Sequence, residues 1–524
     1  MRPSSRPNSP RSGPAEKTNE DLRMRTGAAY REALRDGRRV VVMGEGRVDD
    51  VTTHPATAAM VEEYVAWYDR HLDPEWQDIL LAPVTPEREQ IPWAYVLPKT
   101  SSDLVGMGRS FSKTIFLSAG NVTHTPAYGH LIAMGVLTAT QKQKQNTSAK
   151  NIADAEAYRA SIAKTGRFLT FCGGAAPIGH RLRPDPSERT ALKLVKETDA
   201  GIVISGRIGM HTSPAYAEDV YVGALNGVKI GEHCASFIVP VADPGVTTVC
   251  RKLASRHQSR FLSPLSSRFD ELDGQMWLDN VAIPWEQVFL VEPSPEPIAT
   301  YLLWHHLYGW LARAEFTLGL ALALADSLGL KEHEHTIELL LDLVVEVQTV
   351  RACLTAAEHD PSFTPAGNCY ANYTHLMAGG IALLKGRQRI SEILRQLPGS
   401  SLVVAPSDSD LDDPEIGADL EACFEGGGWT ATQRSALLQL AADHVSSALE
   451  GRESSFELHA SGGLPVWRGR LRQVFPSYNE LANAVLKLVD IPMPEIDVAN
   501  IPAILLAPRR VNTAPPTSPP SEKR

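Results

Sequence analysis

The stretch LYGWLARAEFTLGLALALADSLGL, residues 307–330, carries apolar side chains at three- and four-residue spacing along its whole length. A second stretch with the same spacing follows at residues 335–360, HTIELLLDLVVEVQTVRACLTAAEHD. This spacing is typical of α-helices, and both helices are too apolar to lie alone on a surface. We therefore expect them to pack in a helical bundle that leaves an apolar face for a neighbouring subunit.

A different pattern precedes the bundle, between residues 165 and 290. Short runs rich in valine and isoleucine alternate there with Gly, Pro and Asp; examples are GIVISGRIGM (201–210), CASFIVPV (234–241) and GQMWLDNVAIP (274–284). This alternation predicts an antiparallel β domain with strands of about five or six residues.

The chain begins with helical patterns, at residues 21–36, 56–72 and 102–118, the last opened by Ser102 and Asp103. Helices, then strands, then helices predict an α+β fold. We expect a helical domain at 21–160, a β domain at 161–292, a helical bundle at 293–500, and disordered tails at 1–20 and 501–524.

Composition excludes several classes of protein. The 524 residues carry a net charge of −10, which argues against nucleic-acid binding and against attraction to anionic membranes. No apolar run approaches the roughly 18–20 residues that span a bilayer, and the first residues lack the apolar core of a secretory signal. The six cysteines form no C-x-x-C pair, which favours a reducing cytoplasm. Neither G-x-G-x-x-G nor G-x-x-x-x-G-K-[ST] occurs, so we expect no NAD(P)H site in this chain.

Several longer segments carry a more specific signal. RTGAAYREALRDGRRVVVMGEGRVDDVTTHPA (25–56), THTPAY (123–128), SPLSSRFDELDGQMWLDNVAIPWEQVFL (263–290), LARAEFTLGLALALAD (311–326) and GRESSFELHASGG (451–463) follow one another along the chain. Together they resemble the 4-hydroxyphenylacetate 3-monooxygenase family, the oxygenase components of two-component flavin monooxygenases. The segment at 263–290, with Ser-Ser-Arg, its acidic residues and Ile-Pro-Trp-Glu-x-Val-Phe, is the most specific.

The resemblance implies an acyl-CoA-dehydrogenase-like subunit with an N-terminal helical domain, a middle antiparallel β-barrel and a C-terminal four-helix bundle, assembled as a homotetramer. It implies that reduced FAD arrives from a separate NAD(P)H:flavin reductase and reacts with O2 to a flavin C4a-hydroperoxide. That intermediate would hydroxylate a small aromatic substrate inside a site that excludes water.

The resemblance also points to flavin-binding residues. The loop at 171–177 corresponds to the segment that runs over the flavin ring, where small residues allow a close backbone approach. The segment at 209–214 corresponds to one whose hydroxyl faces flavin N5. Arginines of the bundle suit the phosphates, although surface ion pairing would explain them as well. The expected flavin-binding residues are Gly173, Gly174, Ala176, Pro177, Thr212, Ser213, Arg434 and Arg452.

The substrate site departs from the family pattern. Where the family holds a phenol with Arg, Tyr and His, the alignment through THTPAY places Met107, Phe111 and Cys172. A one-turn shift of the alignment would place Arg109 near the Arg position instead. The altered set favours a phenol or a hydroxypyridine or pyridone of secondary metabolism over 4-hydroxyphenylacetate. With Met107 and Phe111, we expect His124, which replaces an Arg of the family motif, and His305 of the first bundle helix to contact the substrate.

Histidines near the matched segments are candidate bases, because their ordinary pKa suits proton transfer near neutrality. The candidates are His124, His180 and His211, and we expect His211, with Ser213 and Cys172, to serve catalysis. A satisfied core histidine is the alternative for each. His333 and His335 lack metal-ligand spacing and suit a solvated face.

Two other functions share this fold. An acyl-CoA dehydrogenase or dehydratase-like enzyme would need a carboxylate base or an iron–sulfur cluster, for which we find no residues in matched positions. A flavin-binding homologue without this chemistry is the other alternative.

Overall fold

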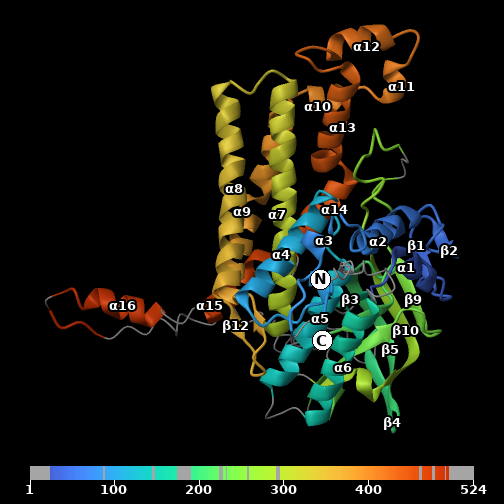
Figure 1. Cartoon of the computed structure of the whole chain (residues 1–524), viewed down its shortest axis with the longest axis vertical. Coiled ribbons are helices and arrows are strands. Elements are labelled where there is room, and N and C mark those ends of the chain that lie inside the picture. Colours follow the sequence, from blue (N-terminus) through green and yellow to red (C-terminus); the bar gives the residue numbers. More distant parts are fainter. Residues whose placement is uncertain are drawn as a thin grey trace, which may run out of the picture.

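The computed structural model describes residues 24–86, 89–143, 148–173, 190–223, 228–231, 233–255, 259–290, 296–459, 463–474, 478–489 and 491–494. The chain runs from helices through two sheets into long helices (Figure 1), which confirms the expected α+β class. The first part contains α1 (Gly27–Ala33), β1 (Val40–Val42), β2 (Gly46–Val48), α2 (Ala58–Arg70), α3 (Gln77–Leu80), a 3-10 turn (Trp93–Tyr95), α4 (Ser101–Phe116), α5 (Pro126–Lys142) and α6 (Ala149–Thr165).

Helix α4 begins one residue before the expected start. The Thr100 hydroxyl accepts the backbone N–H of Asp103 at 3.2 Å, and the Asp103 carboxylate accepts the N–H of Thr100 at 3.1 Å. This reciprocal capping box makes Thr100 the N-cap, so Ser102 lies inside the first turn.

The middle of the chain forms two open sheets. It contains β3 (Leu169–Cys172), β4 (Lys193–Thr198), β5 (Gly201–Thr212), β6 (Asp219–Val222), β7 (Lys229–Ile230), β8 (His233–Pro240), β9 (Val246–Cys250), β10 (Asp273–Pro284), a 3-10 turn (Trp285–Gln287) and β11 (Val288–Leu290). One sheet has the order β2-β1-β9-β10-β5-β4, and the other has the order β11-β8-β6-β3 with β7 beside β8. Apolar residues of both sheets share one core, with Ile204, Val220, Phe237 and Met276 fully buried.

The expectation of an antiparallel β-barrel is wrong in two respects. The strands of the described residues do not close into a barrel. Two pairs are parallel, β1 with β9 and β3 with β6. Alternating apolar residues indicate that a segment is a strand, but they do not say which distant strand it pairs with. Here β1, more than 200 residues before β9, joins the sheet from outside the strand-rich segment.

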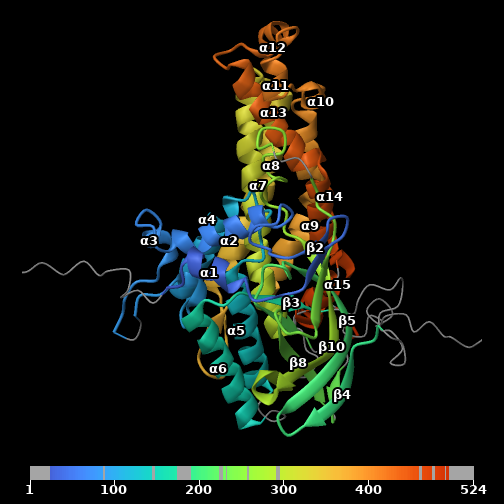
Figure 2. The same cartoon turned by 90° about the vertical axis from the view of Figure 1, so that its right-hand side faces the viewer.

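The last part of the described chain is helical. It contains α7 (Glu296–Ser327), α8 (Glu334–His359), β12 (Ser362–Phe363), β13 (Cys369–Tyr370), α9 (Tyr373–Gln396), α10 (Ser401–Val404), α11 (Asp408–Leu411), α12 (Gly417–Phe424), α13 (Ala431–Ser446), α14 (Ala448–His459), α15 (Gly463–Val474) and α16 (Tyr478–Leu486). Helices α7, α8 and α9 lie side by side, and α15 packs against α9 and α14. Figure 2 shows α14 above the strands, which it contacts through Arg452 and Asp273. No described helix combines the length and apolar character of a membrane span.

A buried carboxylate joins the bundle to α4. Glu358 of α8, 4% exposed, accepts hydrogen bonds from Trp304 Nε1 at 2.9 Å and from the Tyr308 hydroxyl at 2.6 Å, both on α7. Burial raises the pKa of Glu358 to about 7, against the effect of these bonds. Gly108 of α4 lies against this pair, so closely that a side chain there would overlap Tyr308 and Glu358.

We expect Gly108→Ala to destabilise the protein by about 1–3 kcal/mol, because the added methyl group would force α4 away from the Tyr308–Glu358 pair. Gly319→Ala is the matched control. Gly319 lies on α7 with nothing within 4 Å of an added Cβ, and alanine should stabilise the helix there by up to about 1 kcal/mol. Urea unfolding of both variants measures the difference; equal unfolding free energies would contradict the close approach.

Candidate active site

A cavity of about 540 Å³ lies where the six-stranded sheet meets α5, α7 and α14. Its walls are mainly apolar. The residues that line it are Met43, His124, Tyr128, Phe171, His211, Thr212, Val249, Arg251, Asp273, Gly274, Gln275, Leu302, His306, Arg452, Ser455, Phe456 and His459. Four of them, His124, His211, Thr212 and Arg452, are expected site residues that the fold brings to one cavity.

Asp273, at the start of β10, is the centre of a partly buried ion cluster. Arg452 of α14 donates from Nε to Oδ2 at 2.7 Å and from Nη2 to Oδ1 at 2.6 Å. Arg251 donates from Nε to Oδ2 at 3.0 Å, and the Thr212 hydroxyl donates to Oδ1 at 2.7 Å. Burial alone would raise the pKa of the Asp273 carboxyl, but the two guanidinium groups lower it well below its usual value. The ionised carboxylate therefore ties α14 of the bundle to the sheet.

A second buried carboxylate positions His124. Glu271, which is fully buried, accepts the backbone N–H of His124 at 2.7 Å and lies 3.1 Å from His124 Nδ1. It also accepts the Tyr64 hydroxyl at 3.3 Å, and that hydroxyl lies 2.7 Å from Ser213 Oγ. Ser213 has a φ of 61°, a left-handed backbone conformation that residues other than glycine adopt only at a cost in free energy. The Ser213 hydroxyl therefore faces Tyr64, and the adjacent Thr212 lines the cavity.

Two imidazoles on the cavity wall have unpaired nitrogens. Within the described residues, neither ring nitrogen of His211 has a hydrogen-bond partner, and Nε2 of His306 has none. Both side chains are more than nine-tenths buried. Burial lowers the pKa of His211 to about 3 and that of His306 well below its ordinary value. Each ring is therefore neutral and offers one donor and one acceptor.

The residues at the expected phenol-binding positions lie behind this wall. Met107 and Phe111 of α4 are 0% and 1% exposed. The Phe111 ring lies 4.8 Å, centroid to centroid, from the ring of His305 on α7. The lining residues of the cavity do not include Met107, Phe111 or His305. Arg109 is exposed and pairs with Asp78 at 3.4 Å.

Two further expectations fall elsewhere. Cys172 is fully buried in the core shared by the two sheets, not on the cavity wall. Gly173 directly follows β3, while Gly174, Ala176, Pro177 and His180 lie outside the described residues. Arg434 donates to the carbonyl oxygens of Ser327 at 2.9 Å and Gly426 at 2.7 Å, at the opposite end of α7 from the cavity.

Several cavity residues were not singled out from the sequence. Tyr128 and Phe456 pack around the imidazoles: the Tyr128 ring stacks on His306 at 5.3 Å, and Phe456 lies 5.6 Å from the His124 ring. Asp273 and Glu271 stand in the acidic run of the most specific matching segment. That acidic run was the one signal in the sequence that could have pointed to these two residues. It does not show which distant side chain each carboxylate would bind.

The chain belongs to the 4-hydroxyphenylacetate 3-hydroxylase family, whose N-terminal model matches residues 26–290 and whose C-terminal model matches residues 299–489. This confirms the resemblance and the class of enzyme expected from it, the oxygenase component of a flavin-dependent monooxygenase.

Two relatives and one crystal structure illustrate the similarity. The oxygenase component of a 4-nitrophenol 4-monooxygenase/4-nitrocatechol 2-monooxygenase from Rhodococcus opacus is 30% identical over 86% of this chain and 87% of its own. The 4-hydroxyphenylacetate 3-monooxygenase oxygenase component from Thermus thermophilus is 28% identical over 83% of this chain and 91% of its own. A crystal structure of a 4-hydroxyphenylacetate 3-monooxygenase oxygenase component complexed with FAD superimposes with a TM-score of 0.80, at 26% identity over 88% of this chain and 98% of that one.

Acid should destabilise the protein through His211. Its folded pKa of about 3 lies below the ordinary value near 6.5, so the unfolded chain binds more protons between these values. The contribution of neutral His211 to stability is therefore complete above pH 6.5 and is lost as the pH falls towards 3. At pH 5 the loss from this one group is about 2 kcal/mol.

We expect His211→Gln to show a smaller decrease in melting temperature between pH 7 and pH 5 than the wild type. His335→Gln is the control, because the His335 side chain is 76% exposed. Parallel melting curves for wild type and His211→Gln would show that His211 titrates normally in the folded protein.

Proposed function

We propose that the cavity binds the ring system of reduced FAD beside a small neutral aromatic molecule, and that the enzyme hydroxylates that molecule with O2. The observation that carries the proposal is the apolar cavity with neutral, unpaired imidazoles from both the sheet and the bundle. Such a site excludes water and offers fixed hydrogen-bonding groups, as this class of reaction requires. Membership of the monooxygenase family supports it.

The residues present fit a flavin. A flavin ring carries N–H groups and carbonyl oxygens on one edge, and the unpaired nitrogens of His211 and His306 can pair with groups of both kinds. The Thr212 hydroxyl donates a hydrogen bond to Asp273 and accepts one from Arg452 at 3.4 Å, so its oxygen keeps one lone pair for a flavin N–H. Arg452 and Gly173 would lie along the rest of the molecule, and Arg434 would reach a flavin only from a neighbouring subunit. When bound, reduced FAD supplies the electrons with which O2 is activated.

The remaining roles follow from position. Phe171, Leu302 and Phe456 exclude water from the cavity. A Glu271-bound His124 can accept the proton of a ring hydroxyl, which makes the ring richer in electrons, and a neutral His211 can accept a hydrogen bond from such a hydroxyl. Ser213 and Cys172 touch no described part of the cavity, so we propose that they support Thr212 and β3 from behind.

The charges of the cavity favour a neutral substrate. Arg251 and Arg452 are the cationic side chains that line it, and both are paired with Asp273. A carboxylate on the substrate would lose its hydration without gaining a free cation, at a cost of several kcal/mol. We therefore favour a phenol or a hydroxypyridine or pyridone, such as secondary metabolism supplies, over 4-hydroxyphenylacetate.

The reduced flavin would come from a separate NAD(P)H:flavin reductase, because the sequence has no dinucleotide fingerprint and the relatives are named oxygenase components. We place the enzyme in the cytoplasm, where its six free cysteines would stay reduced. An acyl-CoA dehydrogenase would need a free carboxylate in the cavity, whereas Asp273 is held by two arginines.

We expect the purified protein, with chemically reduced FAD, to couple O2 consumption to hydroxylation of a neutral phenol. 4-Hydroxyphenylacetamide should have a kcat/KM at least about tenfold higher than 4-hydroxyphenylacetate, because only the acid buries an unpaired charge. Oxygen uptake and product chromatography give both values. NADH and oxidised FAD without a reductase are the control and should give no product.

Two outcomes would count against the proposal. Well-coupled turnover of 4-hydroxyphenylacetate at the rate of the amide would refute the argument from charge. Reduction of bound oxidised flavin by the organic substrate alone would indicate a dehydrogenase.

We also propose that the subunits assemble into a homotetramer. Helix α8 exposes an apolar stripe at Ile337, Leu341, Val344 and Val345, with exposures of 43%, 56%, 36% and 63%. Residues at this spacing lie on one helical face. Helix α16 projects from the body and exposes Leu481 and Val485 (Figure 1). Monomers rarely leave such faces uncovered.

We expect Val345→Lys to shift the protein towards smaller species, because a lysine would bury an unpaired charge in the subunit contact. Glu338→Gln, on the same helix, is the control and should leave the molecular mass unchanged. Light scattering of the wild type gives the reference, and a fully active monomer would overturn the proposal.

A further inference from the structure

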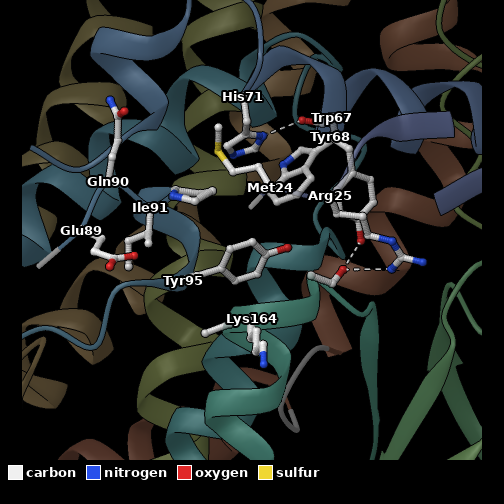
Figure 3. A pocket seen from close by; sticks show the side chains of 13 residues that line it. Met24, Arg25, Trp67, Tyr68, His71, Glu89, Gln90, Ile91, Tyr95 and Lys164 are labelled. Atoms are coloured by element: carbon white, nitrogen blue, oxygen red, sulfur yellow. Dashed lines mark hydrogen bonds between the residues drawn. The ribbon is translucent and has the colours of Figure 1, made fainter. Parts of the chain in front are cut away.

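A second cavity, of about 550 Å³, lies in the N-terminal part of the protein (Figure 3). Its walls come from α2, from residues 89–95, from the end of α6 and from the chain at Met24 and Arg25. It shares no lining residue with the candidate active site.

The interior of this cavity is aromatic. Trp67, Tyr68 and Tyr95 line it, and each is at most 6% exposed. The Trp67 ring lies perpendicular to Tyr68 at a centroid distance of 5.1 Å, and 6.4 Å from Tyr95. Rings at these distances are in contact with one another, so only their outer edges and faces line the cavity, and a flat aromatic ligand can pack against them.

Polar atoms inside the cavity lack partners. Within the described residues, Trp67 Nε1 and the Tyr95 hydroxyl are buried without a hydrogen-bond partner. Buried groups of this kind are normally paired. Figure 3 shows the Tyr95 ring extending between Lys164 and Trp67, with its hydroxyl in the middle of the group. A ligand with an acceptor group would satisfy the indole N–H.

His71 adds an acceptor. Its Nδ1 lies 2.9 Å from the carbonyl oxygen of Trp67, which can only accept, so Nδ1 carries the proton. Burial lowers the pKa of His71 to about 4, and Nε2 is therefore an unprotonated acceptor at neutral pH. A hydroxyl on the ligand ring can donate to it.

The mouth of the cavity carries a free cation. Lys164, at the end of α6, is exposed and makes no hydrogen bond or ion pair with any described residue. Arg25 is already held by Glu218, with Nη2 at 3.1 Å from Oε1. A carboxylate on the ligand would meet Lys164.

We propose that this cavity is a second binding site, for a small aromatic carboxylic acid with a ring hydroxyl. The ring lies among Trp67, Tyr68 and Tyr95, the hydroxyl donates to His71, and the carboxylate pairs with Lys164 and accepts from Trp67 Nε1 or the Tyr95 hydroxyl. The site thus offers Lys164 to an anionic group of its ligand, whereas both cations of the candidate active site are paired with Asp273.

The probe is 4-hydroxybenzoate, and titration calorimetry on the full chain without flavin measures its binding. We expect saturable binding that Lys164→Gln and Tyr95→Phe each weaken by about fivefold, the effect of one hydrogen bond or ion pair. Lys150→Gln, at the other end of α6, is the control and should bind as the wild type does. 4-Hydroxybenzyl alcohol, which lacks the carboxylate, should bind the wild type as weakly as the acid binds Lys164→Gln.

Fluorine NMR of protein labelled with 5-fluorotryptophan locates the ligand. The resonance that Trp67→Phe removes should shift when 4-hydroxybenzoate is added. Absence of binding at millimolar probe, or a shift confined to other tryptophans, would overturn the proposal. Hydroxylation of a neutral phenol by Lys164→Gln should equal that of the wild type, so failure of this site and failure of the proposed activity are distinguishable.

Discussion

The cavity depends on one partly buried carboxylate. Asp273 receives hydrogen bonds from Arg452 of the bundle, from Arg251 after β9 and from Thr212 of β5. Without Asp273, Arg251 would keep Asp270 and Arg452 would keep Glu453 as partners. Loss of Asp273 would still break the ion pairs that join sheet and bundle, at a cost below the roughly 3–5 kcal/mol typical of a fully buried pair that loses one partner. The cluster sets the distance between sheet and bundle, and the space between them is the candidate active site.

The same cluster explains the electrostatics of that space. By pairing the arginines with Asp273, the fold keeps permanent charge at the edge of the cavity and leaves neutral imidazoles on its wall. Hydrogen bonds from neutral groups are directional, and they are stronger in an apolar space than in water because the dielectric constant there is low. The second cavity also has neutral aromatic groups inside, but Lys164 at its mouth has no partner among the described residues.

Periodicity in the sequence predicts the bundle helices and most strands, because burial of one face leaves a local trace. Pairing between distant segments leaves no such trace, which is why β1 beside β9 and the open sheets were missed. The site divides in the same way. His124, His211 and Thr212 could be selected because they stand beside matched motifs, and the fold places them on one cavity wall. The role of Asp273 depends on Arg452, 179 residues later, and the burial of Cys172 depends on the second sheet. Neither could be inferred from spacing.

The cavity wall joins the first strand-forming residues to the last helices: Met43 follows β1, and Phe456 lies on α14. A ribosome therefore has to synthesise the chain from Met43 to Phe456 before the two sides of the cavity can meet. Until then, the strands that will line it have an open apolar edge, a condition in which nascent chains are prone to associate wrongly. Closing so long a loop is also slow, since its entropy is lost before the ion cluster forms. The nascent chain thus acquires this cavity only after α14 has been synthesised.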